Sequence, residues 1–354
     1  MTTVAIVILN YNGQHFLEMF LPSVVSYSSP HTIYVADSAS TDSSVEWLKA
    51  NYPSIRLVEL PSNYGFAGGY NRSLAHIEAD YFVLLNSDVE VTLNWIPPLL
   101  DLLESNQNIA ACQPKLLSYH QQNEFEYAGA AGGYLDWLGY SFCRGRIFYV
   151  CEKDEGQYNS VQKIFWATGA CLMIRAKLFQ EMGGFDEDFF AHMEEIDLCW
   201  RLQLHGHQIY YVPNSTVFHV GGGTLPASNP FKTYLNYRNS LAMMYKNLPE
   251  ERKWRTLFLR LILDGISAVR YLPKFEWQNI LAILKGHFAF YSMVSILAQK
   301  RQKIWSDKNI TKTRASLPVY GKSIVWEYFA RNKKYFKDLN GFYGEVANKG
   351  SLGQ

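Results

Sequence analysis

The stretch VAIVILN, residues 4–10, opens an alternation of short apolar runs with stretches suited to helices. Four similar runs follow it: HTIYVADS (31–38), RLVEL (56–60), YFVLLNSD (81–88) and IAACQPKLL (109–117). Their apolar residues are nearly continuous, as in strands that helices cover on both faces, and their spacing is that of successive β-α-β units. We therefore predict an α/β fold built on a mostly parallel sheet.

The chain divides into an acidic and a basic part. Its 354 residues are 48% apolar, which is enough for one catalytic domain and an appendage. Residues 231–354 hold 22 Lys/Arg and 8 Asp/Glu, whereas residues 1–230 hold 11 and 24. The acidic part is unsuited to nucleic acid but can gather carboxylates around a cation, and the basic part suits an anionic surface, either nucleic acid or membrane. We predict domains at 1–230 and 231–354.

The basic part reads as mainly helical, with apolar segments at 257–272 and 280–298. Charged residues interrupt both segments, so we expect neither to supply the ~20 apolar residues of a spanning helix. They form either a buried helical core or helices that lie on a membrane surface.

Two further features concern the compartment and the middle of the chain. The five cysteines are scattered and the N-terminus lacks the pattern of a signal peptide, so we expect a cytoplasmic protein without a disulfide framework or a zinc site. Residues 118–163 lose all periodicity and are rich in Gly, Tyr and Phe, which we interpret as loops over the site.

Polar residues stand where the predicted strands end: Asn10-Tyr11-Asn12, Asp37, Asn63 and Asn86-Ser87-Asp88. In open α/β sheets ligands bind beyond the carboxyl ends of the strands, so these residues are candidates for a ligand site. The segment NYGFAGGYN (63–71) follows a strand, and its glycines let backbone approach a nucleotide. The Gly-x-Gly-x-x-Gly and phosphate-loop patterns are absent, which disfavours nicotinamide and P-loop chemistry.

Three groups are candidates for chemistry. Asn86 and Asp88 can turn toward one Mg²⁺ or Mn²⁺, although Asn-x-Asp is also common in turns. His219 is either structural or a ligand, and the Gly221–Thr224 segment beside it can open and close.

The third group is Glu194, Glu195 and Asp197, at the start of a predicted helix. Such carboxylates can be a solvated first turn, with Asp197 paired to Arg201. Glu195 instead shares a face with Leu198 and Leu202, which should point inward, so it is a candidate general base.

In this order and spacing, the elements resemble the family 2 glycosyltransferases, inverting enzymes of the GT-A fold, and above all their rhamnosyltransferase-like members. The resemblance covers residues 3 to about 247. It rests on VAIVILNYNG, VADSASTDSS, NYGFAGGYN, LLNSDVEV, the ATGACLMIR to GGFDEDFF stretch, EEIDLCWRLQLHG and FHVGGGT.

The resemblance implies a Rossmann-like GT-A sheet with helices on both faces. It also implies a nucleotide-sugar half at about 1–117, an acceptor half at about 118–230, and a role for each candidate. Asp37 would bind the base, helped by Asn10, Tyr11, Asn12 and Asn63, with Gly65, Asn71 and Asn86 completing the nucleotide site. Asp88 and His219 would hold Mg²⁺ or Mn²⁺, Glu195 would be the base with Glu194 and Asp197 beside it, and Gly169 and Ala170 would line the acceptor side.

Two departures from the family pattern stand out. Asn86 replaces the first acid of the metal motif, which removes one negative charge. Glu195 stands where the family usually has Asp, so the base is one methylene longer and Glu194 could share its role.

The resemblance predicts an inverting, metal-dependent enzyme of cell-surface polysaccharide or glycolipid synthesis. The donor would be a dTDP- or UDP-linked sugar such as dTDP-rhamnose, and the acceptor a saccharide or lipid-linked saccharide. We expect no nucleic acid partner, and a peripheral place on the inner membrane face. The alternatives are a non-catalytic carbohydrate or nucleotide-sugar binding protein and a nucleotidyltransferase.

Overall fold

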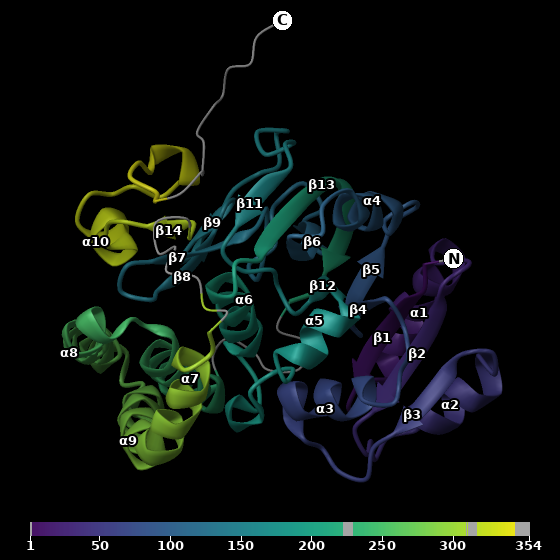
Figure 1. Ribbon diagram of the computed structural model, residues 1–354, viewed down its shortest axis with the longest axis horizontal. Helices are drawn as coiled ribbons and strands as arrows, with labels where there is room; N and C mark the ends of the chain where they lie inside the picture. The colour runs from purple at the N-terminus through teal and green to yellow at the C-terminus, as the bar shows by residue number, and fades with distance from the viewer. Residues whose placement is uncertain (1, 222–228, 309, 311–316, 344–354) are drawn as a thin grey trace, which may run out of the picture.

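A computed structural model describes residues 2–221, 229–308, 310 and 317–343. Its centre is a nine-stranded sheet in the order β11-β13-β6-β12-β4-β1-β2-β3, with β5 paired to β13 (Figure 1). The strands are β1 Val4–Asn10, β2 Thr32–Asp37, β3 Arg56–Glu59, β4 Tyr81–Asn86, β5 Val89–Val91, β6 Ile109–Ser118, β11 Gln162–Ile164, β12 Cys171–Arg175 and β13 Gln208–His219. Neighbours β3, β2, β1 and β4 are parallel, as are β6 and β13, whereas β5, β11 and β12 run the opposite way.

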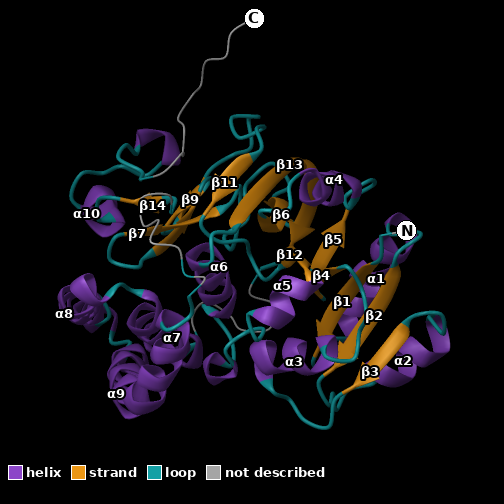
Figure 2. Ribbon diagram, viewed as in Figure 1, coloured by secondary structure: helices purple, strands orange, loops and turns teal. Residues whose placement is uncertain are grey.

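Helices cover both faces of this sheet, as Figure 2 shows. They are α1 Gln14–Tyr27, α2 Ser44–Asn51, α3 Gly65–Leu74, α4 Pro97–Ser105, α5 Ala176–Glu181 and α6 Glu194–Leu204. Side chains of β1 alternate between two cores: Ile6 and Ile8 pack with α1, α2 and α4, and Val7 packs on the side of α3, α5 and α6. The near-continuous apolar runs of the strands follow from this double coverage.

A second, five-stranded sheet occupies much of the segment that we expected to be loops. Its order is β10-β9-β8-β7-β14. The strands are β7 Gly133–Asp136, β8 Ser141–Cys143, β9 Arg146–Ile147, β10 Val150–Cys151 and β14 Val319–Tyr320. The loop prediction was therefore wrong for these residues. Each strand is only two to four residues long, too short to show a period of two in the sequence.

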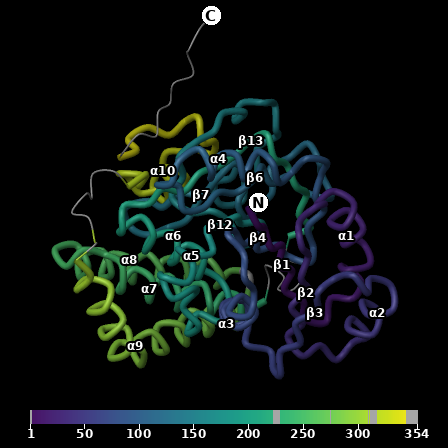
Figure 3. The backbone as a smooth tube through the Cα atoms, turned by 45° about the vertical axis from the view of Figure 1, so that its right-hand side comes forward, coloured from purple at the N-terminus to yellow at the C-terminus, as the bar shows by residue number. Residues whose placement is uncertain are grey.

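The C-terminal part is mainly helical, with α7 Pro230–Asn247, α8 Glu250–Val269, α9 Trp277–Trp305 and α10 Ile324–Phe329. Short 3-10 turns lie at Glu187–Phe189, Leu272–Lys274 and Phe336–Asp338. Helix α7 contacts both α6 and α9, and the view in Figure 3 also shows α7, α8 and α9 grouped together beside α6. Because β14 pairs with β7, the C-terminal part contributes a strand to the second sheet.

Among the described helices, α9 is long and apolar enough to cross a membrane by length and composition alone. This differs from our expectation that neither apolar segment would qualify. The sequence prediction treated Lys285 as an interruption, but a helix of 29 residues contains long windows in which that lysine is the only charge. Such a helix is weak evidence for a span, since core helices of soluble proteins pass the same test.

Candidate active site

The predicted strand-end residues meet at one edge of the main sheet. The register pairs Asn10 with Asp37 and Leu9 with Asn86, so β1, β2 and β4 end side by side. Strand β12 runs antiparallel to β4 and starts at this edge, with Cys171 opposite Leu85. Ala170 precedes it, and its carbonyl accepts a hydrogen bond from the Asn86 N–H at 3.0 Å. The nucleotide and acceptor candidates therefore adjoin here.

A hydrogen-bonded cup joins the ends of β1 and β2. The Asn10 amide donates to a carboxylate oxygen of buried Asp37 at 2.9 Å, and Ser40 donates to Asp37 through its N–H (2.8 Å) and its hydroxyl (2.6 Å). The Asn12 side-chain oxygen accepts from the Thr41 N–H at 2.7 Å. Tyr11 projects from the cup and is 43% exposed. Sequence reasoning missed Ser40, although it lies in the VADSASTDSS motif.

Gly13 connects this cup to the Asn86-Ser87-Asp88 turn. A Cβ at position 13 would lie 2.6 Å from the Asn10 side-chain oxygen and 3.6 Å from the Ser87 hydroxyl. The first distance is shorter than real Cβ contacts, so only glycine fits without a shift. Because of this close approach, the residues predicted to bind the nucleobase lie beside those predicted to bind the metal ion.

Asp88 and His219 face one another at the next strand ends. His219 is the last residue of β13 and pairs with Val89, which places its ring beside Asp88. Its Nε2 lies 3.2 Å from Asp88 Oδ1, and both side chains are buried. The neighbouring Gly221 has a positive φ, whereas residues 222–224 of the predicted glycine-rich segment lie outside the described residues.

Glu126, which sequence reasoning did not select, lies on the other side of the His219 ring. Its Oε1 is 3.4 Å from His219 Nδ1, and its side chain is also buried. Burial alone would lower the pKa of His219, but the carboxylates of Glu126 and Asp88 outweigh burial and raise it to about 10. A carboxylate behind a histidine commonly fixes the ring and its tautomer for metal binding.

Glu194 and Glu195 begin α6, where the helix dipole favours negative charge. Glu194 is buried and Glu195 is partly exposed, while Leu198 and Leu202 on the same side as Glu195 are fully buried. Burial raises the pKa of Glu195 to about 7. Burial and the charge of Glu195 raise the pKa of Glu194 well above its ordinary value. In the described part of the chain, Oε2 of each carboxyl has no hydrogen-bond partner.

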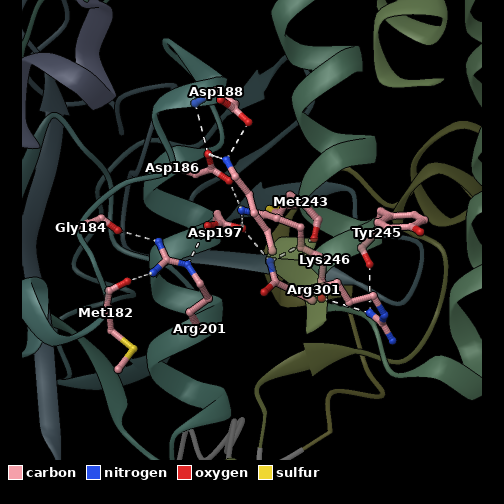
Figure 4. A network of polar contacts seen from close by, with 12 residues as sticks. Met182, Gly184, Asp186, Asp188, Asp197, Arg201, Met243, Tyr245, Lys246 and Arg301 are labelled. Atoms are coloured by element: carbon pink, nitrogen blue, oxygen red, sulfur yellow. Dashed lines mark hydrogen bonds and ion pairs between the residues drawn. The ribbon is translucent and has the colours of Figure 1, made fainter. Parts of the chain in front are cut away.

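Asp197 differs from its two neighbours because every face of its carboxyl is occupied (Figure 4). Arg201 Nε lies 2.8 Å from Oδ2, and Lys246 Nζ and the Asn247 amide lie 2.9 and 2.7 Å from Oδ1. Lys246 also bonds Asp186, which Lys300 of α9 binds as well. The Asp197–Arg201 pair matches the pairing expected from the sequence, but it is buried rather than solvated. This network ties α6 to α7 and α9.

A strained loop leads into Glu194 and Glu195. Phe190, His192 and Met193 all have positive φ, which non-glycine residues adopt at a cost. The amide of buried Asn239 in α7 donates to the carbonyls of Phe189, Ala191 and His192 at 2.9, 2.9 and 2.8 Å. Arg238 donates to the carbonyls of Asp188 and Phe189. Helix α7 therefore holds the backbone that positions the two glutamates.

The same loop contacts the segment 63–71. The Asn63 side chain accepts from the Gly65 N–H at 2.9 Å, and the Ala67 N–H donates to the carbonyl of Phe190. Gly65 has φ +70°, and a Cβ there would overlap Phe190. The start of α3 is thereby joined to the loop that carries Glu195.

Asn71, which we expected at the nucleotide, binds the backbone of the turn after α5. Its amide donates to the Phe185 carbonyl and its oxygen accepts from the Phe185 N–H, both at 2.9 Å. These bonds clamp the turn around Gly184 and occupy both ends of the side chain. Asn71 thus holds the turn that follows α5, and we no longer assign it to the nucleotide.

The backbone of Gly169 lies against the edge of the Phe66 ring of α3, and a Cβ at position 169 would lie 2.9 Å from that ring.

Several buried polar atoms at this edge of the sheet have no hydrogen-bond partner among the described residues. They include one oxygen each of Asn10 and Ser38, and Nε2 of His192. Buried polar atoms are normally hydrogen-bonded, and exceptions gather where a protein binds something. Together with Oε2 of Glu194 and Glu195, they make this edge a candidate ligand site; Gln203, Tyr211 and Glu327 carry such atoms in other parts of the described chain.

Comparisons with known proteins show the family and the fold to which the chain belongs. The family model "Glycosyl transferase family 2" matches residues 5–183. The chain is 28% identical over 230 residues to N-acetylglucosaminyl-diphospho-decaprenol L-rhamnosyltransferase of Mycobacterium tuberculosis, covering 60% of this chain and 75% of that protein. It is 22% identical to rhamnosyltransferase WbbL of Escherichia coli K12, covering 61% and 83%.

Among solved structures, GalNAc-T7 with UDP, GalNAc and Mn²⁺ superposes with a TM-score of 0.54 at 16% identity, covering 70% of this chain and 48% of that one. At that identity the likeness concerns the fold, and it confirms the predicted GT-A architecture. The family match spans half of the chain and includes the strand ends that carry Asn10, Asp37 and Asp88. The chain is therefore a member of glycosyl transferase family 2, a glycosyltransferase with similarity to rhamnosyltransferases.

Proposed function

We propose that this enzyme transfers a sugar from a nucleotide-diphosphate donor to an acceptor hydroxyl with inversion at the anomeric carbon. The donor we favour is dTDP-rhamnose, followed by UDP-linked sugars, because rhamnosyltransferases are among its relatives. The acceptor we favour is a lipid-linked saccharide, since the Mycobacterium tuberculosis relative is named for a sugar carried on diphospho-decaprenol. The product would enter cell-surface polysaccharide or glycolipid synthesis.

The observation that carries the mechanism is the state of Glu195. The residue is partly exposed, its Oε2 is buried without a hydrogen-bond partner among the described residues, and burial raises the pKa of its carboxyl to about 7. A general base works best when its pKa lies near the working pH, and it must be able to reach the acceptor proton. Glu195 meets both conditions.

The neighbours of Glu195 meet them less well. Glu194 is buried, and burial together with the charge of Glu195 raises the pKa of its carboxyl well above the ordinary value. Asp197 is fully buried within its ion pairs, and we assign it a structural role. We propose Gly169 and Ala170 as the acceptor side of the site, because they adjoin Asn86 at the same sheet edge.

Asp88 and His219 have the chemistry of a site for Mg²⁺ or Mn²⁺. A carboxylate oxygen and an imidazole nitrogen face one another, and Glu126 lies behind the imidazole, as is common at metal-site histidines. Because the carboxylates raise the pKa of His219 to about 10, the ion would have to displace a proton from the ring. No group of three or more potential ligands is found in the described part of the chain, so oxygens of the donor and water would complete the shell. The ion would supply positive charge to the diphosphate leaving group.

In the proposed reaction Asp37 and the Asn10–Asn12 turn orient the base and ribose. Glu195 accepts the proton of the acceptor hydroxyl as the hydroxyl oxygen bonds to the anomeric carbon. The bond from that carbon to the diphosphate oxygen breaks in the same step, and the nucleotide diphosphate leaves with the electron pair. One in-line displacement inverts the configuration and needs no covalent intermediate or second nucleophilic carboxylate.

Three measurements test this proposal. Purified protein is screened against dTDP- and UDP-sugars with and without Mn²⁺ by thermal shift, because a ligand of the folded state alone raises the melting temperature. Donor turnover is then followed as release of nucleotide diphosphate, and the anomeric configuration of the product is read by NMR. Binding without release would favour a non-catalytic binding protein, release of pyrophosphate a nucleotidyltransferase, and a retained configuration would refute the single displacement.

A further inference from the structure

Large apolar side chains line the outer side of α8 at intervals of three or four residues. They are Trp254, Phe258, Ile262, Ile266 and Val269. Spacing of this kind places side chains on one face of a helix. Trp254 and Phe258 are 60% and 64% exposed, so most of the surface of these side chains is in contact with solvent, although the edge of Trp254 packs against Tyr245 of α7.

The exposed apolar side chains continue through the turn after α8 and along α9. They are Phe275, Trp277, Leu281, Leu284 and Phe288. Phe275 and Phe288 are 77% and 72% exposed. Helices α8 and α9 contact each other, and Figure 1 shows them at one corner of the molecule, away from the main sheet. We call these side chains of α8, the turn and α9 the apolar surface.

Buried polar contacts fix the opposite faces of the two helices, so the apolar surface cannot turn inward. Asp264 of α8 is fully buried and pairs with Arg260 at 2.8 Å. The ring of His287 in α9 lies 3.3 Å from the second oxygen of Asp264, and the Tyr140 hydroxyl lies 3.2 Å from the first. Rotating either helix would strand a buried charge, which is strongly unfavourable.

Helix α9 is also fixed to α7 at both ends. Near its start, Asn279 accepts a hydrogen bond from Thr233 at 3.0 Å. Near its end, Arg301 donates to the carbonyls of Tyr245 and Lys246, and Trp305 donates to the carbonyl of Lys246 at 2.9 Å. A membrane-spanning α9 would have to give up all of these bonds. The helix is therefore suited to lie on a surface rather than to cross one.

The charges around the apolar surface are basic. Arg255, Arg270 and Lys285 are exposed on the same elements. From residue 252 to residue 288 the acids are Asp264, which is buried, and Glu276, which is partly buried and bonded to Asn279. The exposed acids of α8, Glu250 and Glu251, are confined to its first turn. Beyond that turn, apolar side chains among exposed bases match the headgroup region of an anionic bilayer.

We infer that the apolar surface docks on an anionic phospholipid bilayer, with the aromatic side chains among the headgroups and the helices parallel to the membrane plane. The surface lies outside the transfer site, so the inference holds whichever sugar is transferred. It rests on the proposed function only in that a lipid-linked acceptor requires the enzyme at a membrane.

The test is co-sedimentation of the full-length protein with vesicles of phosphatidylcholine alone and of phosphatidylcholine with phosphatidylglycerol, at low and high salt. The Phe258→Ser/Phe288→Ser double variant removes apolar contact, and Arg255→Gln/Lys285→Gln removes charge. Leu93→Ser is the control, because Leu93 is 70% exposed on the catalytic domain. We expect binding to anionic vesicles that falls with salt, and a loss of about tenfold or more in each double variant. Leu93→Ser should bind as the wild type does.

Three results would overturn the inference: equal binding to neutral and anionic vesicles, no binding at low salt, or undiminished binding of the serine variant. A stable dimer that the serine substitutions dissociate, without vesicle binding, would instead identify the surface as an interface between two copies. Donor hydrolysis in solution should be unchanged in the serine variant. A failure of docking is thereby separated from a failure of the proposed transfer reaction.

Discussion

Asn239 offers a direct test of how the fold positions the catalytic glutamate. The two N–H groups of its side-chain amide donate to three carbonyls of the loop 189–192. Its side-chain oxygen accepts a hydrogen bond from Arg238 Nε at 2.8 Å. With about 1 kcal/mol net for each hydrogen bond, and buried carbonyls left unpaired, Asn239→Ala should cost roughly 2–4 kcal/mol of unfolding free energy. Asn239→Asp keeps the shape and the Arg238 contact but removes the amide donors, so we expect it to lose most of the same stability.

Catalysis should suffer as well, because the loop in question leads directly into Glu195. Three residues of that loop hold positive φ, and such strain persists only while surrounding structure enforces it. A displacement of a catalytic group by about 1 Å can cost about 10²-fold in rate. We expect kcat to fall by about that factor in both variants. The donor KM should change less, because the nucleobase and metal candidates Asp37 and Asp88 lie elsewhere on the sheet edge, although Gly65 and Ala67 contact the loop at Phe190.

The pH profile distinguishes two explanations for a loss of activity in Asn239→Ala. If Asn239 only stabilises the fold, the profile stays as in the wild type, whereas a displaced Glu195 changes it. The pKa of Glu195 is raised to about 7 by burial, from an ordinary value of 4.5. A loosened loop admits water, so the acidic limb of kcat/KM in Asn239→Ala should shift from about 7 toward 4.5. Asn51→Ala is the matched control, since the exposed Asn51 amide makes one bond to the Trp47 carbonyl. An unchanged kcat and pH profile in a destabilised Asn239→Ala would refute the reasoning.

Four further predictions concern the site itself. Glu195→Gln should leave donor affinity nearly intact and lower kcat by about 10²- to 10⁴-fold in a steady-state assay, the usual scale for a lost general base. A comparable loss in Glu194→Gln would show that the two glutamates share the role. In the wild type, Glu195 is protonated below its raised pKa, so kcat/KM should fall tenfold per pH unit below about 7 and level off above it; a flat profile from pH 5 to 8 would exclude this base. Asp88→Ala should abolish Mn²⁺-dependent binding of nucleotide diphosphate in calorimetric titration, and equal binding with Mn²⁺ would mean that the metal site lies elsewhere. Glu126→Gln should weaken Mn²⁺ binding by about 10- to 100-fold in the same titration while metal-free binding is kept, and an unaltered Mn²⁺ affinity would remove Glu126 from the site.

The main sheet could be predicted because its strands carry local signals. Buried parallel strands read as apolar runs, and the polar residues that end them stand out against those runs. The register then brings Asn10, Asp37 and Asn86 to one edge, as parallel pairing requires. The family match, over residues 5–183, includes these strand ends and the turns that follow them.

The second sheet and Glu126 could not be predicted, because their pairing is long-range. Strand β14 pairs with β7 from a position more than 180 residues later in the chain, and neither strand is long enough to show alternation. Glu126 sits in the aperiodic segment, and nothing in its neighbourhood indicates that it lies behind His219. Its position depends on the Glu126 N–H bonding the Leu116 carbonyl of β6, and on β6 pairing with β13 through Leu116 and Val217.

Asn239 and Asn71 both lie inside a helix, and the side chain of each binds backbone outside that helix. An asparagine is unfavourable inside a helix because its side chain competes for backbone hydrogen bonds, so an internal Asn needs a partner outside the helix. Asn239 has such partners in the loop before Glu195, and Asn71 has them in the turn at Phe185. Both residues therefore bind backbone outside their own helices. In α7 the same reasoning points to two internal asparagines, Asn236 and Asn239, and the structure shows that Asn239 binds the loop before Glu195.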